Sequence, residues 1–343
     1  MIVYSTLWGL AADVEVVDRR ELGRLGTARA LLRSVRPGDA VLLNGALGFA
    51  DRYADQLVAV ALRYLRPQVT LVLADATWEP RSTPGEARHP ILARLVEAWN
   101  KLLVRLVDGP RTHFCFLAAS ECADAVAEAG IHPSRVHFTP FCTTIWEQDQ
   151  LDRLERIAAE PGTFVFSGGN ASRNYPLLLD AVDGLETPVC VATTQNLGPV
   201  PRHVRSGPVS PEEFLELMAA SRAVVLPLST TTGRSGGQQT YLNALLLGKP
   251  VVVTDAPGVR DYLADGVHAL VVPPTADDLR RAVQWVLDGD NAEQVRAMCE
   301  RGRELARRLS PARYHAQLVE LARRAAGEPA GRLGEQLDRE LTV

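Results

Sequence analysis

Two short glycine-containing segments in the second half of the chain have the residue types of an anion site. The first, Gly168-Gly169 followed by Arg173, comes after an apolar run and before an apolar helical pattern. The second runs from Arg234 to Thr240 and stands in the same position relative to a later apolar run. Glycines let the backbone approach a ligand closely, and free amides at a helix start favour phosphate. Because each arginine adds a bidentate donor, the two segments together predict a bound diphosphate.

The second segment also fits a hydrolase pattern. Gly233-Arg234-Ser235-Gly236-Gly237 matches GxSxG, and His268 and His315 lie downstream as candidate bases. A nucleophile elbow requires a tight turn directly from strand to helix. Residues 229–232 intervene here, so the phosphate interpretation is favoured and a serine hydrolase is kept as an alternative.

Polar residues that follow two predicted strands of the first half are candidates for ligand contacts. Asp75 comes after one strand and is followed by Trp78 and Glu79, and Asn44 comes after the preceding strand. A carboxylate at this place could orient a substrate hydroxyl or act as a general base. The simpler interpretation, that Asp75 caps a loop or a helix start, has equal standing.

The elements that must position these residues alternate between strands and helices. Short apolar runs rich in β-branched residues are separated by helix-length stretches, which predicts an α/β fold with parallel sheets. The predicted strands are Ala40–Leu43, Val69–Ala74, Phe114–Ala118, Val136–Thr139, Thr163–Phe166, Val189–Thr193, Ala223–Pro227, Pro250–Thr254 and Ala269–Val272. Ser210-Pro211 with a glutamate at 213, Thr275 and Ser310-Pro311 mark three helix starts.

The length of 343 residues predicts two domains, because a single hydrophobic core stops growing at roughly 250–300 residues. We expect an N-terminal domain over residues 1–150 and a second over 151–310, separated near the charged stretch 148–162. Residues 311–343 form a last helix, which we expect to return to the first domain, and a tail. Ligands of such sheets bind beyond the carboxyl ends of the strands.

Composition narrows the class of protein. The net charge is −4, so no global basic field attracts nucleic acid. No apolar run is long enough to span a bilayer, no basic leader precedes the N-terminal residues, and the five cysteines lack metal or disulfide spacing. We therefore expect a cytoplasmic protein. The amphipathic helix predicted over 90–108 is expected to pack on the core; the alternative is peripheral contact with the inner face of a membrane.

A resemblance adds to these inferences. The stretch from Ser235 to Tyr262, with Gly266 and the residues after it, resembles the donor site of glycosyltransferases with two Rossmann-like domains facing a cleft, the GT-B fold. It is most similar to the retaining glycosyltransferase family four. The stretch 167–181 resembles the first phosphate loop of that family, with Arg173 at the position that contacts the donor diphosphate. The likeness is specific between residues 163 and 290 and weak before residue 110.

The chain departs from that family at two positions. The family carries two glutamates, one contacting the donor sugar and one the ribose; Ser235 and Asn243 stand at those places here. An asparagine can still hydrogen-bond hydroxyls through its amide, whereas a serine supplies no negative charge. Where many members have an acceptor-side histidine, this chain has Asp75.

The residues and the resemblance together predict a glycosyltransferase that moves a sugar from a nucleotide diphosphate to an acceptor hydroxyl. The resemblance implies retention of configuration. The arginines and amides of the two segments would take the place of a metal ion, and no other cofactor is expected. The expected donor-site residues are Gly168, Gly169, Arg173, Val209, Arg234, Ser235, Gly236, Gly237, Gln238, Gln239, Thr240 and Asn243. Asp75, Glu79 and Arg173 are the expected catalytic residues, and Asn44 and Trp78 the acceptor contacts. The alternatives are a catalytically silent nucleotide-sugar-binding subunit and a related coupling reaction on a nucleotide sugar.

Overall fold

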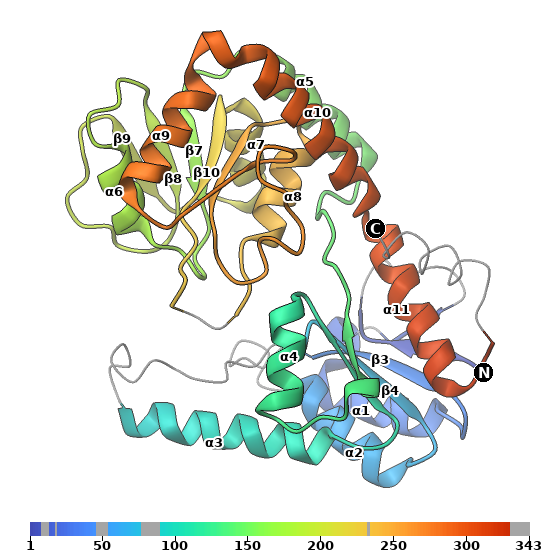
Figure 1. Cartoon of the computed structure of the whole chain (residues 1–343). Helices are drawn as coiled ribbons and strands as arrows, with labels where there is room; N and C mark the ends of the chain where they lie inside the picture. The colour runs from blue at the N-terminus through green and yellow to red at the C-terminus, as the bar shows by residue number, and fades with distance from the viewer. Residues whose placement is uncertain (8–13, 18, 46–53, 77–89, 232–233, 330–343) are drawn as a thin grey trace. The chain divides into compact units, whose positions relative to one another are not determined.

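The computed structural model describes residues 1–7, 14–17, 19–45, 54–76, 90–231 and 234–329. The chain forms two compact units, each built around its own six-stranded parallel sheet (Figure 1). The first unit contains Met1–Pro140 and Ala312–Val343, and the second contains Phe141–Pro311. The first unit thus ends at Pro140 instead of at residue 150, and residues 312–343 are counted with it.

The sheet of the first unit has the order β2-β1-β3-β4-β5-β6. Its strands are β1 (Val3–Ser5), β2 (Val14–Val16), β3 (Ala40–Asn44), β4 (Thr70–Ala74), β5 (Thr112–Phe116) and β6 (Val136–Phe138). Its helices are α1 (Arg19–Ser34), α2 (Ala54–Leu65), α3 (Pro90–Val107), α4 (Ala119–Ala127) and α11 (Pro311–Ala326). The chain leaves β1 toward one side of the sheet and β3 continues on the other, so the order reverses between these two strands.

The sheet of the second unit has the order β12-β11-β10-β7-β8-β9. Its strands are β7 (Val165–Gly168), β8 (Val189–Ala192), β9 (Val204–Gly207), β10 (Ala223–Leu226), β11 (Val251–Thr254) and β12 (Leu270–Val272). Its helices are α5 (Gln148–Ala159), α6 (Tyr175–Val182), α7 (Pro211–Ala220), α8 (Gln238–Leu246), α9 (Ala276–Leu287) and α10 (Ala292–Arg308). Counted within the unit, this is the Rossmann order 3-2-1-4-5-6, which reverses between β7 and β10.

The nine strands predicted from the sequence are present, which confirms the α/β class and the parallel sheets. Val165, Val224 and Val252 lie in the middle of the second sheet without exposed surface, as expected for strands covered on both faces. Ser210 and Thr275 cap α7 and α9 as predicted, each accepting the backbone N–H three residues on. The charged stretch 148–162, near which the domain separation was expected, contains the helix α5.

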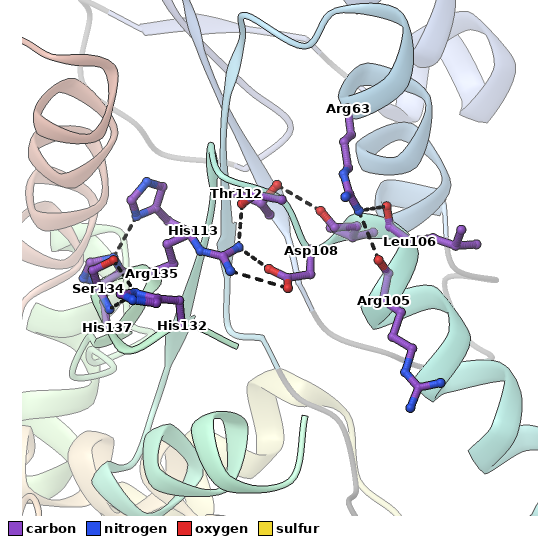
Figure 2. A network of polar contacts seen from close by, with 12 residues as sticks. Arg63, Arg105, Leu106, Asp108, Thr112, His113, His132, Ser134, Arg135 and His137 are labelled. Carbon is purple, nitrogen blue, oxygen red and sulfur yellow. Dashed lines mark hydrogen bonds and ion pairs between the residues drawn. The ribbon is translucent and has the colours of Figure 1, made fainter. Parts of the chain in front are cut away.

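Two arginines secure the end of α3 in the first unit (Figure 2). The Arg63 guanidinium donates to the carbonyls of Arg105 and Leu106, at 3.0 and 2.5 Å. Those carbonyls belong to the last turn of the helix, where they have no partner within the helix. Arg135, just before β6, forms an ion pair with Asp108, which follows α3. The end of α3 is therefore tied both to α2 and to the edge of the sheet.

Two histidines on the neighbouring strands β5 and β6 point toward one another (Figure 2). His113 Nδ1 and His137 Nε2 are 3.0 Å apart, so one ring donates and the other accepts. Burial is the largest cause that lowers the pKa of each ring, to about 4 for His137. Both rings are therefore neutral near pH 7.

The amphipathic helix predicted over 90–108 exists as α3, and its apolar side chains fall into two groups. Leu103 and Val107 are buried in the first unit. Leu95, Trp99 and Leu102 are exposed, and their spacing places them along one stripe of the helix. Among the described residues, no helix combines the length and the apolar character needed to cross a membrane.

Candidate functional site

The two glycine-containing segments of the second unit meet where its strand order reverses. The backbone N–H of Asn174, after β7, donates to the carbonyl of Pro227, after β10, at 2.7 Å. The N–H of Ser229 donates in turn to the carbonyl of Ser172 at 3.1 Å. Ligands of Rossmann-type sheets bind at such a reversal, outside the carboxyl ends of the strands. The topology therefore places both segments at the expected binding position.

Arg173 joins the two segments through its side chain. Its Nε donates to the carbonyl of Gly168 at 2.9 Å and its Nη1 to that of Ala171 at 2.9 Å. Its Nη2 donates to Thr240 Oγ1, in the first turn of α8, at 3.1 Å. A guanidinium carries five N–H groups, so two remain beyond these three bonds.

Within the part of the chain that the structure describes, no carboxylate neutralises the charge of Arg173. Among the described residues, none forms an ion pair with it. Burial lowers the pKa of its guanidinium, which nevertheless stays charged because arginine starts from a very high pKa. A desolvated cation with spare N–H groups is stabilised by an anion, and phosphate oxygens match the planar fork of arginine.

Gly169 is required by this arrangement for two reasons. Its φ is +114°, where side chains are strained, and a Cβ placed on it would lie 2.6 Å from Arg173 Nη2. Its carbonyl accepts hydrogen bonds from Tyr175 Oη at 2.5 Å and Thr193 Oγ1 at 3.1 Å. The neighbouring Gly168 lies under the ring of Phe214, 2.4 Å from where its Cβ would be. The loop after β7 is thus held in one shape.

The second segment packs closely on the first. A Cβ on Gly236 would lie 2.9 Å from the Cβ of Ser172, so a glycine permits this approach. Ser172 itself adopts φ +53°, a strained conformation for a side chain, and such residues concentrate at functional sites. Gly237, at φ +86°, precedes α8 directly, and the exposed Gln239 stands in the first turn of that helix. The start of α8 therefore lies beside the Arg173 loop.

The structure gives the serine and histidine of the hydrolase alternative other partners. Ser235 is buried, and its Oγ accepts a hydrogen bond from Gln238 Nε2 at 2.7 Å. His268 Nδ1 accepts the backbone N–H of Ala264 at 3.2 Å. Arg234, one residue before the serine, is half-buried. Gly233 lies outside the described residues.

Asn243 is held by a contact that the sequence does not reveal. Its Oδ1 accepts the backbone N–H of Thr144 at 2.8 Å, and its Nδ2 donates to Thr144 Oγ1 at 2.9 Å. Both ends of the amide are thus engaged within the second unit, and the side chain is 1% exposed. The structure ties Asn243 to the segment that leads into α5.

A cavity of about 1100 Å³ adjoins these residues within the second unit. Of the predicted donor-site residues, it is lined by Gly169, Val209, Gln239, Thr240 and Asn243. The remainder of its wall comes from the segment 144–153 and from residues 210–215 around the start of α7. No sequence pattern places the segment 144–153 in the site, because its charged residues are typical of a linker.

The candidate acceptor residues belong to the first unit. Asn44 ends β3, and its backbone N–H donates to Asp55 Oδ2 at 2.9 Å. Asp75 follows β4 with φ +51°, a second strained side chain at a strand end. Trp78 and Glu79 lie outside the described residues. Both described candidates thus follow adjacent strands, β3 and β4, at the carboxyl edge of the sheet.

Comparison with known proteins agrees with the chemistry of the second unit. Residues 173–305 match the family model of glycosyl transferases group 1. The match identifies a glycosyltransferase domain in this unit, and it confirms the enzyme class predicted from the sequence. No curated protein matches the chain in sequence.

Solved structures share the fold of the whole chain at low identity. A glycosyltransferase from Rickettsia africae has a TM-score of 0.61 and 8% identity over 92% of this chain and 86% of its own. Sucrose-phosphate synthase from Thermosynechococcus elongatus has a TM-score of 0.63 and 14% identity over 92% and 82%. Anabaena HepE in complex with UDP-glucose has a TM-score of 0.60 and 15% identity over 90% and 85%. These likenesses establish the GT-B type of fold.

Proposed function

We propose that this chain transfers a sugar from a nucleotide diphosphate sugar to an acceptor hydroxyl. The observation that carries the proposal is Arg173, an arginine without a carboxylate partner among the described residues. It bonds to both glycine-containing segments where the Rossmann-type order reverses. The glycosyltransferase domain found over residues 173–305 supports the same reaction.

In this proposal the second unit stabilises the leaving group. Negative charge grows on the diphosphate as the bond to the sugar breaks, so donors fixed in advance lower the barrier. The spare N–H groups of Arg173 and the amides at the start of α8, from Ser235 to Gln239, supply such donors. We propose that they act without a metal ion and that, as in glycosyltransferase family four, the configuration at the sugar is retained.

HepE is described in complex with UDP and with UDP-glucose, so uridine diphosphate sugars are the first donors to test. We propose that the first unit supplies the acceptor side, with Asp75 orienting or deprotonating the acceptor hydroxyl and Asn44 contacting the acceptor. The strained φ of Asp75 supports this assignment, because such strain concentrates at functional sites. From the sequence analysis we add Glu79 as a catalytic residue and Trp78 as an acceptor contact.

The test is release of nucleoside diphosphate from a panel of nucleotide sugars, with and without sugar, lipid and small-molecule acceptors. Acceptor-dependent release with formation of a glycoside supports the proposal, and NMR of the product reports the anomeric configuration. Activity that persists in excess EDTA supports a reaction without a metal ion. Binding of nucleoside diphosphate without any turnover would contradict transfer.

A catalytically silent binding subunit is the second candidate. Two observations favour it: Ser235 and Asn243 stand where the resembling family carries glutamates, and both polar ends of Asn243 already bond to Thr144. This candidate predicts nucleotide-sugar binding with no turnover by the isolated chain. Turnover by the purified chain alone excludes it.

We propose in addition that α3 contacts a membrane surface. The exposed stripe Leu95, Trp99 and Leu102 lies beside exposed Arg94 and Arg105, a combination that suits anionic lipid. Co-sedimentation with phosphatidylglycerol vesicles tests it, and Leu95→Glu with Leu102→Glu is expected to reduce binding severalfold. If the wild type and the double variant sediment with the vesicles to the same extent, lipid contact by α3 is contradicted.

A further inference from the structure

The cavity of the second unit extends beyond the residues expected to hold a diphosphate. Gly169 and Thr240, both in contact with Arg173, form one part of its wall. Another part is formed by Trp146, Glu147 and Asp149, where the chain enters α5. A volume of about 1100 Å³ exceeds what a diphosphate alone needs, so there is room for the remainder of a nucleotide.

The residue expected to hold the ribose has another partner. Asn243 uses its amide oxygen and one N–H on Thr144, with distances of 2.8 and 2.9 Å. With 1% of its surface exposed, it has little left to offer a ligand. Ribose hydroxyls are best held by a carboxylate, which accepts a hydrogen bond on each oxygen. If a ribose binds in this cavity, an acidic residue of its wall is therefore a better candidate than Asn243 to hold the hydroxyls.

Three carboxylates line the cavity, and one of them is already neutralised. Glu212, in the first turn of α7, pairs with Arg153 at 2.7 Å. Glu147 and Asp149 form no ion pair with any described residue. Asp149 stands in the first turn of α5, where an acidic side chain interacts favourably with the helix dipole. Glu147 occupies the N-cap position of α5 without making a side-chain cap bond, so its carboxylate retains its acceptors.

An aromatic side chain stands directly beside Glu147. Trp146 lines the same cavity and is 53% exposed. Exposure of so large an apolar ring inside a cavity favours an apolar or aromatic ligand group, and nucleobases stack on tryptophan. Phe214 and Val209 on the opposite segment extend the apolar part of the wall.

We propose that the Trp146-Glu147 pair binds the nucleoside of the donor, with the indole against the base and the Glu147 carboxylate accepting the ribose hydroxyls. Asn243 then positions Thr144, two residues before the pair, and does not contact the ribose. The inference rests on the proposed function, because it assigns the nucleoside of the same donor. It names as binding residues two that neither the resemblance nor the sequence pattern indicates.

Calorimetric titration of Glu147→Ala tests the inference, with Asp152→Ala as the matched control on the exposed side of the same helix. The probes are UDP, its 2′,3′-dideoxy form and inorganic pyrophosphate. Loss of hydrogen bonds to a charged group predicts that Glu147→Ala weakens UDP about tenfold to a hundredfold and leaves pyrophosphate unchanged. The variant should also no longer distinguish UDP from the dideoxy form, while Asp152→Ala should behave like the wild type.

The failures of the two proposals are distinguishable. A wild-type chain that binds neither pyrophosphate nor UDP, GDP or ADP contradicts the proposed function itself. A wild-type chain that binds UDP, with a Glu147→Ala variant that keeps its affinity and its preference over the dideoxy form, overturns only the present inference. Equal weakening of UDP and pyrophosphate in Glu147→Ala would overturn it as well. A Trp146→Leu variant that binds UDP less tightly but pyrophosphate normally would support the base contact, and unchanged UDP affinity would contradict it.

Discussion

The two sheets reverse their strand order at different places, and side chains of opposite charge tie the strand ends there. In the first unit the order reverses between β1 and β3. There the buried Asp55 carboxylate accepts the hydroxyl of Thr6 at 2.7 Å and the N–H of Asn44 at 2.9 Å. In the second unit the reversal lies between β7 and β10, and the Arg173 guanidinium ties the end of β7 to the first turn of α8, the helix that follows β10.

The comparison shows that the strand-order reversal provides the place for a binding site. The charged side chain at the reversal, Asp55 or Arg173, decides which ligand can bind there. A carboxylate at the reversal repels a diphosphate, whereas a guanidinium with spare N–H groups attracts one. The same α/β architecture therefore offers an anion site in the second unit and a polar, acidic edge in the first. An acidic edge suits a neutral polyhydroxyl acceptor, in keeping with the proposed acceptor side.

The largest expected effect on UDP affinity comes from Gly169→Ala, a substitution that would displace the Arg173 guanidinium. In Gly169→Ala, a Cβ would lie 2.6 Å from Arg173 Nη2 at a φ of +114°, so the guanidinium must move. We expect affinity for UDP to fall about a hundredfold, measured by calorimetry, from the loss of charge-assisted hydrogen bonds. Gly184→Ala is the matched control, because Gly184 has φ +81° and a Cβ added to it would meet no atom within 4 Å. Similar UDP affinities in the two variants would contradict the claim that the position of the Arg173 guanidinium determines UDP binding.

The corresponding change in the first unit should affect stability and not nucleotide binding. Asp55→Ala leaves the buried hydroxyl of Thr6 and the N–H of Asn44 without this acceptor. The expected loss is about 2–4 kcal/mol in the free energy of unfolding, from urea titration. Glu128→Ala, an exposed residue of the same unit, should change little. An Asp55→Ala variant with wild-type stability, or with weakened UDP binding, would break the comparison.

A smaller effect is expected in how the stability of the first unit depends on pH. Burial lowers the pKa of His113 and His137, so between about pH 6.5 and 4 the unfolded chain binds more protons than the folded one. Stability should therefore fall as the pH falls through this range and stay level above it. In His137→Phe the fall in Tm between pH 7 and 5 should be smaller, while the exposed His132→Gln should follow the wild type. Identical pH profiles for all three proteins would contradict this account.

Much of the fold could be predicted from the sequence, because nine strands are apolar runs with β-branched residues. The short strands β1, β2 and β9 were not predicted; β9 contains Arg205 and Ser206, and it exists because its backbone pairs with β8. The helix α5 in the charged stretch 148–162 was not predicted, because charged residues separate its apolar positions Leu151, Leu154 and Ile157.

The sequence predicted only those segments of the site that directly follow a strand. The two glycine-containing segments each follow a strand of one parallel sheet, so their carboxyl ends share an edge, and the structure brings them together. The bond between Asn243 and Thr144 joins residues 99 positions apart, and no local pattern indicates it. For the same reason the sequence did not reveal that Trp146 and Glu147 line the cavity.

The central claim is that Arg173 holds a diphosphate, and calorimetry of Arg173→Ala with UDP tests it most directly. The control is Arg281→Ala, an exposed arginine that pairs with Asp278 on α9. The account predicts UDP binding about a hundredfold weaker in Arg173→Ala than in the control, with both variants folded by circular dichroism. An Arg173→Ala protein that binds UDP as tightly as the control would contradict it.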